Sequence, residues 1–153
     1  GVSFAIEGDR AAMRLAGRIV KKLGGSPYPI RKQDKSAYHA WATFTSPLLT
    51  ALLTTTEEVA KLAGVTGEDA RRRMMPILWQ TLANYADFGA ARGFSGPIIR
   101  GDVETVKRHL KILRGNPAAR QVYVALACAA LQYLPAKNNI ALRRLLRDVP
   151  EAR

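Results

Sequence analysis

The chain has 153 residues, of which 48% are hydrophobic and 7% aromatic, enough apolar side chain for one folded domain of ordinary size. A single cysteine, Cys128, excludes an internal disulfide, and no apolar run reaches the 18 or so residues that a membrane-spanning helix needs. The 24 Lys and Arg residues outnumber the 12 Asp and Glu residues and give a net charge of +12. We expect a cytoplasmic protein that does not contact membranes, with Cys128 as a small buried core residue.

The first thirty residues predict a strand, a helix and a second strand. Residues 2–7 have β propensity, and Asp9 is placed to cap a helix over 10–23 that ends at Gly24-Gly25. Two prolines in residues 27–30 allow only an edge strand. Two strands are not a stable sheet by themselves, and the rest of the chain supplies no further strand. We therefore expect the remainder of this sheet to lie before Gly1.

Residues 35–64 form the longest helical pattern, and it has two faces. A core stripe is predicted in an arc of about 80°: Trp41, Phe44, Leu48, Leu52, Val59 and Leu62. The opposite arc holds Lys35, His39, Thr43, Ser46 and Thr50. Such a set suits contact with a ligand, and an ordinary polar face is the alternative. Pro47 predicts a kink.

The remaining segments are helical. Thr66 and Asp69 form a predicted capping box for a helix that runs toward Gly89, with a bend at Pro76. Residues 89–101 predict a loop rich in glycine, after which Asp102 caps a helix. Asn116-Pro117 opens a helix to residue 134, and residues 140–146 predict a last amphipathic helix.

Several kinds of site are excluded by spacing. The two histidines, His39 and His109, are far apart and there is one cysteine, so no metal-ligand pattern exists and no metal is expected. The chain has no G-x-G-x-x-G turn, P-loop or nucleophile elbow. His109 lies on an amphipathic helix, which favours a structural role.

Two stretches can carry chemistry. Lys35 and His39, four residues apart, place an ammonium and an imidazole on one helix edge, where each cation would lower the pKa of the other. In the stretch from Ser95 to Asp102, glycines allow close backbone approach and Arg100 can pair with a carboxylate or phosphate.

The basic residues are scattered over several helical segments, which favours solvated faces. A module that binds nucleic acid or an acidic partner is the alternative, and it requires the basic clusters to converge on one surface. Nucleic acid is not expected as a partner.

The segments together resemble a bacterial family. They are FAIEGD, LGG, K-x-x-YHA, T-x-x-N at Thr81 to Asn84, Gly89, and SGPIIRGD followed by TVKRHL. This order, over about residues 3 to 133, is similar to Rossmann-type oxidoreductase-like proteins whose C-terminal half is a conserved domain of unknown function. That half is similar to the helical C-terminal domains of 6-phosphogluconate dehydrogenase, pyrroline-5-carboxylate reductase and deazaflavin-dependent NADP oxidoreductases.

The resemblance implies a mainly α fold after a short β-α-β remnant of a Rossmann domain. Residues 1–33 would be the end of that domain, and residues 34–153 a helical domain for substrate binding and dimerisation. The resemblance implies NADP or NAD, bound mainly by the half that precedes residue 1. The family commonly has Ala where Trp41 stands and Asn where Pro47 stands, so the substrate or the activity can differ here.

The implied function is hydride transfer to or from a small carbonyl, imine or hydroxy substrate, in a homodimer. Lys35 would be the acid or base, and His39 would orient or relay. The implied substrate-binding residues are Ser46, Asn84, Ser95, Gly96, Pro97, Arg100 and Asp102. The chain without its Rossmann half would be inactive. A purely structural dimerisation domain is a further alternative, in which Lys35 and His39 face plain solvent.

Overall fold

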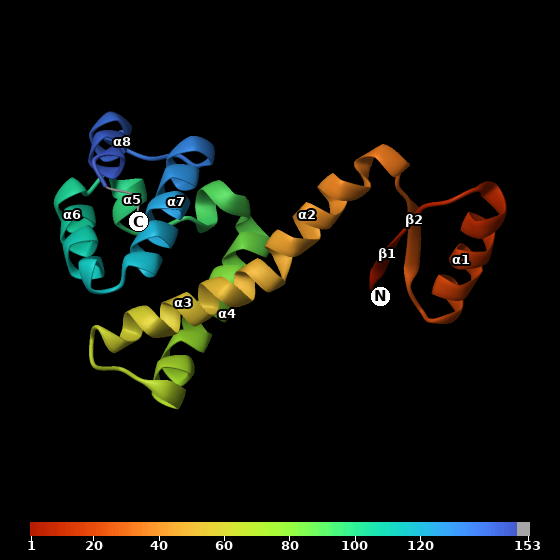
Figure 1. The fold of residues 1–153 in the computed structure, drawn as a ribbon, viewed down its shortest axis with the longest axis horizontal. Helices are drawn as coiled ribbons and strands as arrows, with labels where there is room; N and C mark the ends of the chain where they lie inside the picture. Colours follow the sequence, from red (N-terminus) through yellow and green to blue (C-terminus); the bar gives the residue numbers. More distant parts are fainter. Residues whose placement is uncertain (150–153) are drawn as a thin grey trace. The chain divides into compact units, whose positions relative to one another are not determined.

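A computed structural model describes residues 1–149 of the chain (Figure 1). The described part is mainly helical, with one short parallel sheet near the N-terminus, as the sequence predicted. In chain order the elements are β1 (Ser3–Ile6), α1 (Arg10–Lys22), β2 (Ser26–Pro29), η1 (Lys32–Asp34), α2 (Lys35–Thr45), α3 (Pro47–Lys61), α4 (Gly67–Gly93), α5 (Pro97–Arg100), α6 (Val103–Ile112), η2 (Leu113–Gly115), α7 (Pro117–Tyr133) and α8 (Asn139–Arg147). The chain divides into two compact units, Gly1–Thr50 and Ala51–Arg153. The expected domain boundary between residues 33 and 34 stays a prediction.

The first unit contains the predicted strand, helix and strand. Strands β1 and β2 pair in parallel, with Ser3 opposite Ser26 and Ile6 opposite Pro29, and α1 lies alongside them (Figure 1). The Asp9 side chain accepts a hydrogen bond from the Ala12 N–H at 2.8 Å, so the predicted cap of α1 is confirmed. Because β1 and β2 run in parallel, both strands end at the same edge of the sheet.

The predicted long helix over 35–64 is two helices. Helix α2 ends at Thr45, Ser46 has φ −124° and ψ −74°, and α3 begins at Pro47. A proline lacks the N–H that a continuous helix would need, but it is well suited to the first position of a new helix. The expected kink is therefore a complete break, and Ser46 lies in it.

The predicted core stripe on these two helices is wrong. Trp41 is 61% exposed and Phe44 is 73% exposed, and neither α2 nor α3 contains a buried residue. The stripe has the right period, but periodicity shows which residues share a face and does not show what covers that face.

Helix α4 begins after Thr66, as predicted, but the capping box does not form. Thr66 makes no side-chain cap hydrogen bond, and Asp69 pairs instead with Arg72 at 2.6 Å. The helical backbone is interrupted at Gly89, whose φ is 72° and ψ is 174°, so the predicted end at this residue is confirmed in the backbone. One further helical turn follows, so the expected loop over 89–101 is wrong in part: it also contains α5.

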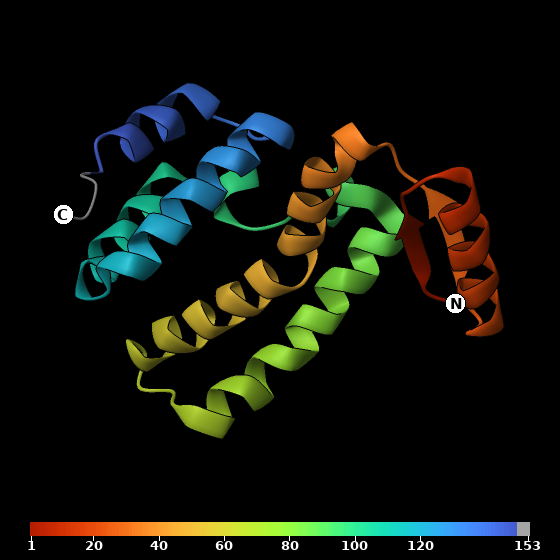
Figure 2. The ribbon, with the colours of Figure 1, turned by 45° about the vertical axis from the view of Figure 1, so that its right-hand side comes forward.

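The core lies among the C-terminal helices, which Figure 2 shows grouped together. Six buried residues form it: Val106 and Leu110 on α6, Ala127 and Leu131 on α7, and Leu142 and Leu146 on α8. Cys128 packs against this cluster as a core residue would, but it is half-buried and not buried as expected. The Asn116 side chain accepts from the Ala119 N–H at 3.0 Å, which confirms the predicted cap of α7.

Gly101 ends α5 and packs against the segment that precedes α8. Its φ is 68°, and its carbonyl accepts from the Asn138 side chain at 3.0 Å. A β-carbon on Gly101 would lie 2.6 Å from the carbonyl oxygen of Lys137, which is backbone and cannot swing aside. The glycine in this turn is therefore required by packing within the fold.

We expect Gly101→Ala to lower the free energy of unfolding by about 2–4 kcal/mol, because left-handed strain and a backbone clash add. Gly64→Ala is the matched control, since Gly64 has a similar φ of 74° with nothing within 4 Å of a β-carbon. It should cost only about 1 kcal/mol. Urea unfolding measures both, and equal losses for the two variants would show that the Lys137 clash is relieved at no cost.

Candidate functional site

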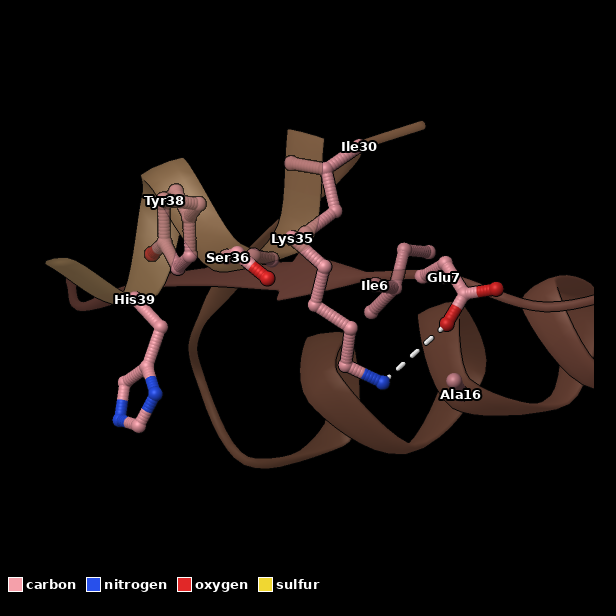
Figure 3. Close-up of a pocket in the computed structure, with 9 residues that line it drawn as sticks. Ile6, Glu7, Ala16, Ile30, Lys35, Ser36, Tyr38 and His39 are labelled. Carbon is pink, nitrogen blue, oxygen red and sulfur yellow. Dashed lines mark hydrogen bonds and ion pairs between the residues drawn. The ribbon is translucent and has the colours of Figure 1, made fainter. Parts of the chain in front are cut away.

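A hollow of about 760 Å³ lies in the first unit, where β1 and β2 end (Figure 3). Its lining includes Ile6 and Glu7 at the end of β1, Ile30 after β2, and Lys35 and His39 from α2. In open α/β sheets, ligands bind at the carboxyl ends of parallel strands, because loops and helix ends leave a crevice there. The two predicted catalytic residues therefore line one hollow, on the side of the sheet where ligands commonly bind.

Lys35 has a partner that sequence reasoning missed. Its Nζ lies 3.3 Å from Oε2 of Glu7, with 67% of the lysine side chain and 25% of the glutamate side chain exposed (Figure 3). Glu7 follows β1, and Lys35 comes six residues after β2 ends. Because neighbouring parallel strands end at one edge, the polar residues just after each strand are the signal that could have identified this pair.

His39 lies one helical turn after Lys35 and lines the same hollow. Figure 3 shows the Lys35 chain reaching toward Glu7, while the imidazole of His39 lies to one side. The sequence pattern indicated only the two neighbouring cations, Lys35 and His39. The carboxylate of Glu7 has to be added to that pair. In this arrangement Lys35 pairs with Glu7, and the ring of His39 lies apart from that pair.

Aromatic rings connect α2 to β2 and fix the edge that carries these two residues. Tyr28 and Tyr38 meet edge to face at 5.9 Å, and Tyr38 meets Trp41 in the same way at 5.4 Å. Hydrogen bonding with Tyr38 raises the pKa of Tyr28. Trp41 thus packs on Tyr38, and this contact gives Trp41 a structural role.

The polar edge of α2 and α3 beyond His39 is used largely by the helices themselves. The Thr43 hydroxyl donates to the His39 carbonyl at 2.9 Å, and the Thr50 hydroxyl donates to the Ser46 carbonyl at 3.2 Å. Such bonds to the preceding turn are common for threonine in helices. Ser46 itself is exposed at the break between the helices.

The other predicted substrate-binding residues belong to the second unit. Asn84 lies on α4 and accepts a hydrogen bond from Gln80 at 2.9 Å. The stretch from Ser95 to Asp102 surrounds α5: Gly96 is its N-cap, Pro97 its first residue and Arg100 its last, and Ser95 and Arg100 are exposed. That this stretch and the Lys35 edge meet across one cleft stays a prediction.

Asp102 has a clear structural task. Its Oδ1 accepts from the Thr105 N–H at 3.0 Å and caps α6, as predicted. Hydrogen bonds from the Thr105 backbone and side chain, helped by the charges of Arg100 and Arg108, lower the pKa of the Asp102 carboxyl. A carboxylate engaged in this way is better suited to holding the segment after Arg100 in place than to exchanging protons.

The cap predicts a pH dependence of stability. Because the folded pKa of Asp102 is below its unfolded value, its contribution is present above about pH 4 and is lost as the pH falls through the folded pKa. Asp102→Asn, which keeps a capping oxygen but cannot titrate, should show a smaller loss of thermal stability between pH 5 and pH 2 (circular dichroism). Asp87→Asn, on an exposed carboxylate of α4, is the control, and identical profiles for the two variants would contradict this role.

Residues 1–149 contain no group of three or more His, Cys, Asp or Glu side chains placed to hold a metal ion. His109 instead lies 3.1 Å through Nδ1 from the Tyr123 hydroxyl, and the two rings meet edge to face. Burial raises the pKa of Tyr123.

None of the described helices is both long and apolar enough to cross a lipid bilayer.

Comparison with protein families matches residues 2–130 to a family described as a domain of unknown function. The predicted resemblance to a conserved domain of unknown function is thereby confirmed, from before β1 into α7. Comparisons with curated proteins and with solved structures gave no match. The chain therefore belongs to the family Domain of unknown function (DUF2520).

Proposed function

We propose that this chain is the C-terminal part of an NAD(P)-dependent oxidoreductase, with a C-terminal domain like that of 6-phosphogluconate dehydrogenase. It completes the substrate cleft and joins two copies of the protein. The observation that carries the proposal is the hollow at the carboxyl ends of β1 and β2, lined by Lys35 and His39. Fold analogy alone does not fix an activity, so the proposal rests on the chemistry of these side chains.

In this proposal the nucleotide is bound elsewhere in the complete protein. The sequence has no glycine-rich dinucleotide-binding turn, and the described sheet has only two strands. A Rossmann half before residue 1 would extend that sheet and hold the nucleotide, which supplies the hydride acceptor or donor. This chain supplies the side chains that bind the substrate and exchange a proton with it.

Each proposed role follows from the chemistry of the residue. Lys35, held by Glu7 at the hollow, exchanges a proton with the reacting oxygen or nitrogen of a small carbonyl, imine or hydroxy compound. His39, on the next turn of α2, orients that group. Arg100 is exposed at the end of α5 and binds an anionic group of the substrate, since its guanidinium fits a carboxylate in two-point contact.

The test is NADPH and NADH binding by the chain joined to a Rossmann half as one complete protein. Isothermal titration measures binding, and loss of absorbance at the nicotinamide band measures turnover with small carbonyl and imine compounds. Binding together with turnover of at least one compound class supports the proposal. A complete, folded protein that binds neither nucleotide would defeat it.

A further inference from the structure

A second hollow, of about 370 Å³, lies in the second unit against α6, and basic side chains surround it. Five cationic residues line it: Lys107, Arg108, Lys111, Arg114 and Arg120. Only two acidic residues, Glu104 and Asp148, share the lining. Five of the 24 Lys and Arg residues therefore gather at one place in the fold.

The helical period explains this gathering. Lys107, Lys111 and Arg114 are spaced by four and three residues, so they lie on one face of the α6–η2 segment. Val106 and Leu110 on α6 are buried in the core, which fixes the direction of that face. Because the core holds the helix, the three cations are brought to the hollow by the fold itself.

Arg120 from α7 lines the hollow, and its side chain has one unsatisfied donor. Its Nε is buried and has no hydrogen-bond partner among the described residues. Buried donors are normally paired, because losing their water without a replacement is costly. Because Arg120 lines the hollow, its guanidinium group adds a positive charge there.

The two carboxylates do not neutralise the site. Glu104 lies 3.9 Å from Lys107 and is its ion-pair partner, while Arg108 donates to the Thr105 hydroxyl at 2.9 Å. Within residues 1–149 no ion pair joins Lys111, Arg114 or Arg120 to an acidic side chain, in contrast to Arg71 and Arg72 on α4. The hollow therefore has a local excess of positive charge.

Its lining also indicates the size and kind of ligand. Leu110, Leu145 and Val149 supply aliphatic surface beneath the charges. None of the described lining residues is aromatic, so there is no ring on which a nucleic-acid base could stack. A cavity of this volume with converging guanidinium groups suits a compact phosphate group, to which arginine donates in two-point contact.

We propose that the hollow between α6 and the start of α7 binds a small phosphate-bearing molecule, with Arg120, Arg114 and Lys111 as its anion ligands. This site is independent of the Lys35 hollow, since the two are lined by different units. A failure of phosphate binding at this hollow would leave the proposed oxidoreductase activity at the Lys35 hollow untouched, and the reverse also holds. The two proposals can therefore fail separately.

The probe is inorganic pyrophosphate, added to the 153-residue chain at low salt. We expect a dissociation constant below about 1 mM by isothermal titration. Amide shifts in nitrogen–proton NMR spectra should cluster on α6, η2 and the first turns of α7. Arg120→Gln should weaken binding at least about ten-fold, because it removes a charge-assisted donor.

Arg72→Gln is the matched control: it removes the same charge from an exposed arginine on α4, and we expect a change of less than about two-fold. If Arg120→Gln fails to fold, the double variant Lys111→Gln, Arg114→Gln takes its place, since both side chains are exposed. Equal weakening by the Arg72 and hollow variants would overturn the site, because it would show only diffuse attraction. Tight binding of single-stranded RNA or DNA with no response to pyrophosphate would also overturn it.

Discussion

Replacement of Lys35 by methionine is expected to lower kcat of the complete protein by about 10²–10⁴-fold, the usual contribution of one general acid or base. Methionine keeps most of the length of the lysine side chain but cannot carry a proton. Lys61→Met is the matched control, because Lys61 also pairs with a glutamate, Glu58, at 2.6 Å, but lies on α3 outside the lining of the hollow. It should leave kcat unchanged.

A second variant separates proton transfer from simple charge. Lys35→Arg keeps the positive charge and can still reach Glu7, but arginine does not release its proton in proteins. We expect KM near that of the native protein and kcat as low as in Lys35→Met. Full activity in Lys35→Arg would mean that the residue only attracts an anionic substrate, and equal effects of the Lys35 and Lys61 variants would remove Lys35 from the mechanism.

Local features could be predicted from the sequence because they depend on neighbours in the chain. The caps at Asp9, Asp102 and Asn116 each require one side-chain oxygen three residues before an N–H, and all three formed. The capping box at Thr66 failed although its pattern was correct. There Asp69 pairs with Arg72, one helical turn away, and Thr66 makes no cap bond.

Features that depend on distant parts of the chain could not be predicted. The pairing of Lys35 with Glu7 joins residues 28 positions apart, and it becomes visible only once β1 and β2 are known to be parallel. The basic hollow likewise combines α6 and α7 with the end of α8. Helical periodicity placed each cation on a face, but only packing showed which faces point to the same hollow.

The apolar surface of α4 supports the proposed homodimer. On a helical projection, seven apolar residues fall within an arc about 160° wide: Met74, Met75, Ile77, Leu78, Leu82, Tyr85 and Phe88. Ile77 is 69% exposed, Tyr85 is 63% exposed and Leu82 is 50% exposed. Only Ala70 is buried in this 27-residue helix. A second copy of the chain, with the same stripe, would cover this surface by a self-complementary contact.

We therefore expect the chain to sediment as a dimer at twice 16.8 kDa, and the double variant Leu82→Glu, Tyr85→Glu to sediment as a monomer. Two apolar contacts are lost and two carboxylates meet an apolar surface, so the dissociation constant should rise at least about 100-fold. The matched control is Gln80→Glu, Ala83→Glu, which adds the same charge at the same spacing on the opposite side of α4. Sedimentation equilibrium decides: a native chain at 16.8 kDa, or equal dissociation of both double variants, would show that this stripe is not where two copies meet.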